Sequence, residues 1–249
     1  MIDRLMNRKG LLHDPLQPDP DYTLTKAVEA VELVRPFAEP NGELQVMFSP
    51  WHHNATYYGF EAQRRAKMGS TVLTIISHPQ VIEPNPQRVL DSYKYLVDTA
   101  VSTIDEQQAD FDRLRLFAAS SGTVALAAVA KAKAGEVSSA AMLAGGDSLI
   151  DSVWHGQRTI LLKSALEADG WTFDKLDELW QPLSVYGSLD AFTGKPVDFV
   201  RSTRDLNVLP ASQERYSEAL RAAGAEVNEH VSHLGHYATI GIALRFGVE

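Results

Sequence analysis

The 249-residue sequence predicts an α/β fold with a mostly parallel central sheet and helices on both faces. Three observations indicate this class. From residue 44 onward, apolar segments of strand length alternate with segments of helical periodicity. Polar residues suited to chemistry follow the ends of several predicted strands. A hydrophobic fraction of 45% in a chain of this length is sufficient for one large core, so we expect one domain over residues 1–249.

The elements of the first half follow from periodicity and from proline and glycine positions. Residues 1–21 contain three prolines and predict an extended arm, and a helix is predicted over 25–34, ending before Pro36. The predicted strands are 44–48, 71–76, 114–118 and 139–143, and the predicted helices between the first three are 56–68 and 88–104. Strands that alternate with helices pair in parallel through right-handed crossovers.

The alternation is interrupted after residue 143 and resumes near residue 196. Helical segments are predicted over 148–168 and 174–180, so residues 148–182 are expected to form a small helical cap insertion. Three of the four tryptophans lie there, and Trp154 and Trp180 are expected to wall an apolar substrate pocket. The last predicted elements are a strand from residue 196, a helix over 211–223 and a strand over 226–231.

A serine lies where one predicted strand passes directly into a helix rich in small residues. Ser120 follows the strand over 114–118, and Ala118 and Gly122 are the small neighbours that a sharp strand-to-helix turn requires. Ser121 is the competing candidate, but its own small position would then fall on the β-branched Thr123. The pattern therefore favours Ser120 as a nucleophile.

An aspartate and a histidine follow later strands, in the order Ser, Asp, His. Asp205 comes after the strand that begins at residue 196, and the dipeptide Gly235-His236 follows the last predicted strand. With the Ala-Ala-Ser-Ser-Gly turn, these landmarks resemble those of the α/β-hydrolase superfamily over roughly residues 44 to 249. The resemblance implies a serine hydrolase that cleaves a carboxylic ester or related acyl bond through an acyl-enzyme intermediate, without a cofactor.

In that chemistry Ser120 attacks, His236 acts as general base and then acid, and Asp205 orients the imidazole. The resemblance also implies an oxyanion hole that includes the backbone N–H of Ser121. A second donor is expected from the loop that begins at Ser49-Pro50, where family members often have His-Gly. Because proline has no N–H, Trp51 is the expected donor, and His52 is the alternative if the loop is displaced; His52 is also an expected substrate-binding residue.

Other residues compete for the acid and base roles. Asp147 also follows a predicted strand and is a reserve for Asp205. His230 and His233 compete with His236, which the preceding glycine lets turn inward. The three histidines, spaced three apart, also raise a metal-dependent hydrolase as an alternative. That spacing drifts around a helix and does not match a strand, so we expect no metal.

Composition limits the partners. The net charge of −9 carries no acidic or basic blocks, so we expect a small-molecule acyl substrate and neither nucleic acid nor a membrane, with a homo-oligomer left open. The chain has no cysteine, which excludes disulfides, thiolate zinc sites and a cysteine nucleophile, and it has no glycine-rich phosphate loop, which argues against nucleotide binding. The N-terminal segment lacks the apolar core of a signal peptide and no apolar run reaches transmembrane length, which predicts a cytoplasmic protein. A noncatalytic binding protein with the same fold is the alternative to an enzyme.

Overall fold

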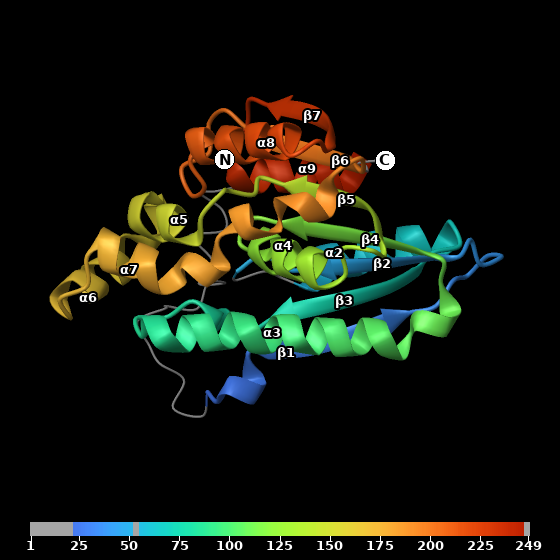
Figure 1. The fold of residues 1–249 in the computed structure, drawn as a ribbon, viewed down its shortest axis with the longest axis horizontal. Helices are drawn as coiled ribbons and strands as arrows, with labels where there is room; N and C mark the ends of the chain where they lie inside the picture. Colours follow the sequence, from blue (N-terminus) through green and yellow to red (C-terminus); the bar gives the residue numbers. More distant parts are fainter. Residues whose placement is uncertain (1–21, 52–54, 247–249) are drawn as a thin grey trace.

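A single seven-stranded sheet organises the molecule in the computed structural model, which describes residues 22–51 and 55–246. The strand order is β1-β3-β2-β4-β5-β6-β7 (Figure 1). β1 pairs antiparallel with β3, and all the other neighbouring strands of this sheet pair in parallel. The predicted mostly parallel α/β architecture is confirmed.

The strands and helices have the following bounds. The strands are β1 (Val28–Val34), β2 (Glu43–Phe48), β3 (Thr71–Ser77), β4 (Arg113–Ala119), β5 (Val137–Leu143), β6 (Pro196–Ser202) and β7 (Glu226–Ser232). The α-helices of the described residues are α2 (Ala55–Lys67), α3 (Pro86–Glu106), α4 (Gly122–Ala132), α5 (Leu149–His155), α6 (Ile160–Ala168), α7 (Phe173–Trp180), α8 (Pro210–Ala222) and α9 (His236–Phe246). The predicted extended arm over 1–21 lies outside the described residues.

The helix predicted over residues 25–34 is wrong. A short 3-10 turn, Leu24–Lys26, leads into β1, which pairs with β3 from Val28 opposite Ser77 to Val34 opposite Val72. The valines at 28, 31 and 34 have a spacing that also suits a helix, which explains the error. Their β-branched side chains favour extended backbone, and the open edge of β3 supplies hydrogen-bond partners that sequence periodicity does not reveal.

Helices cover both faces of the sheet and create two buried layers. On one face the side chains of α3, α4 and α8 join the larger apolar core, with Leu96, Leu126 and Leu220 as members. On the other face α2 and α9 contribute Tyr58 and Ile240 to a smaller core over the same strands. The sheet is therefore shielded on both sides, as a parallel sheet requires, and its carboxyl edge is left for the site.

The segment between β5 and β6 lies beyond the carboxyl end of the sheet, where α5, α6 and α7 gather (Figure 1). A 3-10 turn, Gln157–Thr159, divides the predicted helical segment over 148–168. The break falls at Gly156, where an added Cβ would lie 2.3 Å from the carbonyl oxygen of Ser152 and 2.7 Å from that of Asn207. Within the described part of the chain, no helix is long and apolar enough to cross a membrane.

Candidate active site

Ser120 occupies a strained turn between β4 and α4. Its φ is 52°, in the left-handed region that a non-glycine residue adopts at a cost of roughly 1–2 kcal/mol. The turn is held because the Ser120 N–H donates to the carbonyl of Leu143 at 2.8 Å. A Cβ at Gly122 would lie 2.7 Å from the carbonyl oxygen of Phe48, so only glycine fits two residues after the serine. The small-residue pattern in the sequence therefore has a steric cause.

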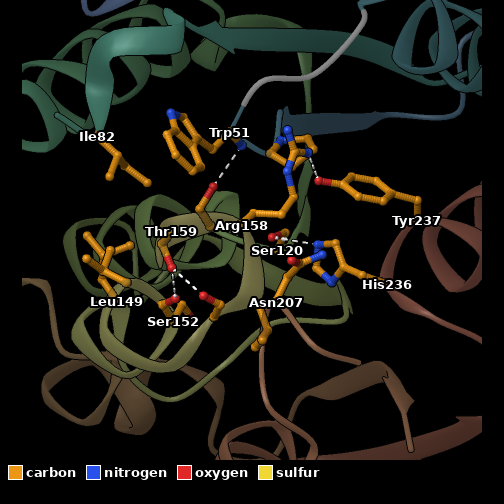
Figure 2. Close-up of a pocket in the computed structure, with 15 residues that line it drawn as sticks. Trp51, Ile82, Ser120, Leu149, Ser152, Arg158, Thr159, Asn207, His236 and Tyr237 are labelled. Carbon is orange, nitrogen blue, oxygen red and sulfur yellow. Dashed lines mark hydrogen bonds between the residues drawn. The ribbon is translucent and has the colours of Figure 1, made fainter. Parts of the chain in front are cut away.

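His236 lies between Ser120 and Asp205 and is hydrogen-bonded to both. Its Nε2 is 2.9 Å from Ser120 Oγ, and its Nδ1 is 2.5 Å from Asp205 Oδ2. Figure 2 shows the serine hydroxyl and the imidazole facing each other. His236 is the first residue of α9, and only 4% of its surface is exposed. The structure thus brings together the three residues that the sequence selected, separated by up to 116 positions.

Asp205 is buried and accepts several hydrogen bonds. Its Oδ1 accepts from the backbone N–H groups of Asn207 and Val208, at 2.8 and 3.0 Å. Its Oδ2 accepts from Gln213 Nε2 at 2.9 Å, in addition to the contact with His236. These donors fix the direction of the carboxylate. Gln213 was not singled out in the sequence, because it acts from the first turns of α8 and carries no motif.

The reserve aspartate, Asp147, belongs to a different network. Its carboxylate accepts from Arg215 at 2.7 Å, from Ser212 at 2.6 Å and from Tyr186 at 2.8 Å. The side chain of His236 is hydrogen-bonded to Asp205 and Ser120 instead. The geometry therefore favours Asp205 over Asp147 as the partner of the histidine.

The two expected oxyanion donors, the backbone N–H groups of Ser121 and Trp51, lie next to Ser120. The N–H of Trp51 donates to Ser121 Oγ at 2.8 Å, so in this arrangement it is already engaged. Tyr93 donates to the Ser121 carbonyl at 3.4 Å, and burial raises the pKa of Tyr93, which keeps its hydroxyl protonated. Ser121 therefore joins the loop after β2 to the strand-to-helix turn. His52 lies outside the described residues.

The pocket beside Ser120 has an apolar side and a polar side (Figure 2). Its lining residues are Pro50, Trp51, Ile82, Ser120, Ser121, Leu149, Ser152, Val153, Gly156, Arg158, Thr159, Asn207, Val208, His236 and Tyr237. Residues 149–159 supply six of these fifteen. Sequence reasoning missed Arg158 and Tyr237; for Tyr237 the only available signal was its position next to His236.

The structure does not bring Trp154 and Trp180 to this pocket. Trp180 is 3% exposed, and its Nε1 donates to the carbonyl of Pro86 at 2.9 Å. Trp154 packs edge to face on Phe173, with ring centroids 6.2 Å apart, and lies under the ammonium of Lys163. The two tryptophan rings pack within the segment and against the rest of the domain. Leu149 and Val153 form the apolar wall of the pocket that was expected of Trp154 and Trp180.

The two other histidines near the end of the chain, His230 in β7 and His233 just after it, contact other partners. His230 contacts Asn228 at 3.2 Å, and His233 contacts Thr203 at 3.0 Å. Both are exposed. Among residues 22–51 and 55–246, no group of three or more His, Asp or Glu side chains is arranged to hold a metal ion.

Comparisons with known proteins identify the fold. No protein-family model matches the sequence, and no curated protein matches it. Solved structures do. An acylaminoacyl peptidase from Pyrococcus horikoshii aligns with a TM-score of 0.64 and 12% identity over 86% of this chain, which spans only 36% of the peptidase. Est1E from Butyrivibrio proteoclasticus aligns with a TM-score of 0.59 and 14% identity, over 87% of this chain and 91% of Est1E.

A cold-adapted esterase from an Arctic intertidal metagenomic library aligns with a TM-score of 0.57 and 12% identity, over 86% of this chain and 82% of the esterase. Sequence identities this low are evidence for a shared fold and not for a shared function. Sheet order, helical layers and these likenesses agree: the chain has the α/β-hydrolase fold.

Proposed function

We propose that this protein is a serine hydrolase that cleaves a carboxylic ester or a related acyl bond through an acyl-enzyme intermediate. The observation that carries the proposal is the continuous hydrogen-bond path from Ser120 Oγ through His236 to the buried Asp205. The path begins at the one described serine with a positive φ, which exposes its hydroxyl at the carboxyl edge of the sheet. Structural strain of this kind is concentrated at functional sites.

The chemistry follows from the donors and acceptors present. His236 Nε2 takes the proton of Ser120 as Oγ bonds to the substrate carbonyl carbon, and Asp205 stabilises the imidazolium that results. The π electrons of the carbonyl move onto its oxygen, which becomes an oxyanion. When the oxyanion re-forms the carbonyl, the bond to the leaving group breaks, and His236 Nε2 returns the proton to the departing oxygen. Water then repeats the sequence on the acyl-serine and releases the acid.

The oxyanion requires hydrogen-bond donors at the turn. The Ser121 N–H is the first candidate, because it follows the nucleophile at the start of α4 and no acceptor for it is found in the described residues. Trp51 would become the second donor if its N–H exchanged Ser121 Oγ for the oxyanion as its acceptor. Each pre-placed donor of this type lowers the activation barrier by about 3–4 kcal/mol.

We further propose that residues 148–182 act as a cap that sets substrate preference. The apolar side of the pocket takes Leu149 and Val153 from α5 and Ile82 from the loop after β3. Apolar acyl groups gain about 0.8 kcal/mol per methylene buried against such a wall. The structural likeness to named esterases and a peptidase supports the general class, and the substrate itself is part of the proposal.

A fluorophosphonate probe tests the proposal directly, because it labels a serine only when a base has activated it. We expect stoichiometric labelling that mass spectrometry places on Ser120, and loss of labelling in Ser120→Ala. Hydrolysis of an activated aryl ester should fall by about 10⁴-fold or more in the same variant. Ser121→Ala is the matched control and should keep the label. A label on Ser121, or none on the folded wild type, would overturn the assignment.

A further inference from the structure

Arg158 places a positive charge inside the pocket, and the proposed hydrolysis does not use it. The residue projects from the 3-10 turn between α5 and α6 and lines the pocket together with Ser120 and His236. Its guanidinium lies over the ring of Tyr237, 5.3 Å from the centroid, and Nη1 donates to the Tyr237 hydroxyl. The side chain is therefore held by an aromatic ring and a hydroxyl, which direct it without neutralising it.

The described residues offer Arg158 no acidic partner. The neighbouring carboxylates pair with other side chains: Asp147 and Asp151 pair with Arg215, at 2.7 and 2.6 Å, and Asp205 contacts His236. In residues 22–51 and 55–246, no Asp or Glu oxygen lies within ion-pair distance of Arg158. The chain as a whole carries a net charge of −9, so this local charge opposes the overall field.

The position of the guanidinium indicates which part of a substrate it would meet. Figure 2 shows it on the side of Tyr237, away from the apolar wall formed by Leu149 and Ile82. His236 must return its proton to the leaving oxygen, so the leaving group lies on the histidine side of Ser120. Tyr237 follows His236 directly in α9. Arg158 therefore faces the leaving-group side, and the apolar wall faces the acyl side.

We infer that Arg158 is a specificity-determining residue that binds a carboxylate on the leaving-group portion of the substrate. A guanidinium presents parallel N–H donors that match the two oxygens of a carboxylate. The preferred substrates would then be esters in which the alcohol portion is a hydroxy acid, or similar acyl derivatives whose leaving group carries a carboxylate. This inference rests on the proposed function, because it deepens the same site.

Three aryl esters separate the alternatives. Phenyl acetate is neutral, 3-acetoxybenzoate carries a carboxylate on the leaving group, and phenyl hydrogen succinate carries it on the acyl group. We expect Arg158→Gln to lower kcat/KM for 3-acetoxybenzoate by roughly 10- to 100-fold, the range for a lost hydrogen-bonded charge contact, and to change phenyl acetate by less than about twofold. Comparing each variant with wild type on the same ester cancels differences in intrinsic reactivity.

Lys163→Gln is the matched control, because it removes one positive charge from α6 while Lys163 lies over Trp154 and outside the pocket lining. It should leave all three esters nearly unchanged. Arg158→Lys should recover only part of the loss, since it keeps the charge without the planar donor pair. Raised salt should reduce the wild-type preference for 3-acetoxybenzoate.

Two results would overturn the inference. Equal losses on all three esters would make Arg158 a structural residue, and a loss confined to phenyl hydrogen succinate would place the anion on the acyl group. Circular dichroism and thermal unfolding of Arg158→Gln show whether the variant is folded. Failure of the proposed function has a different signature: wild-type protein that hydrolyses none of the esters and does not react with the fluorophosphonate probe.

Discussion

A non-glycine residue with positive φ follows both β4 and β5, but the two residues differ in their side chains and partners. Ser120 follows β4 with φ of 52°, and Ala144 follows β5 with φ of 49°; these are the two non-glycine residues with positive φ in the described chain. Each N–H donates to a carbonyl of the next strand in the sheet, Ser120 to Leu143 at 2.8 Å and Ala144 to Val200 at 2.7 Å. A left-handed residue whose N–H donates to the next strand is thus repeated at the ends of two adjacent strands.

The difference lies in the side chain and its partners. Ser120 Oγ meets His236, whereas the Ala144 methyl is fully buried in the smaller core beneath α2 and α9. After Ala144 the chain continues to Asp147, which is held by Arg215 and not by the histidine. A left-handed residue at a strand end is therefore insufficient to identify a site. A hydroxyl there, aligned with a base and a buried acid, is the feature that supports catalysis.

The largest expected contrast is between the aspartates that follow β6 and β5. Asp205→Asn should lower kcat/KM for an activated ester by about 10⁴-fold, because the imidazole loses the carboxylate that orients it. Asp147→Asn should change kcat/KM little and should lower the free energy of unfolding by about 1–3 kcal/mol, since Arg215 is half exposed and keeps Asp151. Ester kinetics and urea unfolding check both. The reverse order in kcat/KM would move the acid to Asp147.

Glycines two residues beyond each turn offer a second contrast, in stability. At Gly122 a Cβ would meet backbone carbonyl oxygens of Phe48 and Ser49, at 2.7 and 2.8 Å, which belong to β2 and its loop. At Gly146 a Cβ would meet side-chain atoms of Ser212 and Val208, at 2.6 and 2.8 Å. Side chains yield more easily than the backbone of a central strand.

We therefore expect Gly122→Ala to lower the free energy of unfolding by about 2–3 kcal/mol and Gly146→Ala by about 1 kcal/mol. Urea unfolding midpoints, with the slope compared between variants, measure both values. Gly122→Ala should also slow ester hydrolysis, because the turn carries the nucleophile. Equal destabilisation by the two substitutions would show that the loop after β2 relaxes as readily as a side chain.

The smallest expected effect is at Ala144 itself. Ala144→Gly removes left-handed strain of about 1–2 kcal/mol, but it also gives up about 0.8 kcal/mol of buried methyl and about 0.5–1 kcal/mol of backbone entropy. The free energy of unfolding should therefore stay within about 1 kcal/mol of wild type, and ester hydrolysis should be unchanged. A large loss of activity would link the two turns through the Ser120–Leu143 hydrogen bond.

Local sequence was sufficient for most of the fold. The bounds of these elements lie within two residues of the predicted ones: β2 to β5, β7, α2, α3, α7 and α8. Apolar periodicity marks each of them, and proline or glycine limits several of them. β1 was missed because its valine spacing fits two periodicities, and the choice between them depends on β3, which lies more than thirty residues away in the chain.

The candidate site divides in the same way. Small residues around Ser120, and the positions of Asp205 and His236 after strands, are written in the chain, so the sequence alone determined which three residues to expect at one sheet edge. Four features depend on how distant segments pack. They are the distances between these three residues, the ion pair of Asp147 with Arg215, the packing of Trp154 and Trp180 away from the pocket, and the position of Arg158 in the pocket lining. Only the tertiary structure decided these, because periodicity specifies the face a side chain takes on its own element and not the partner it meets there.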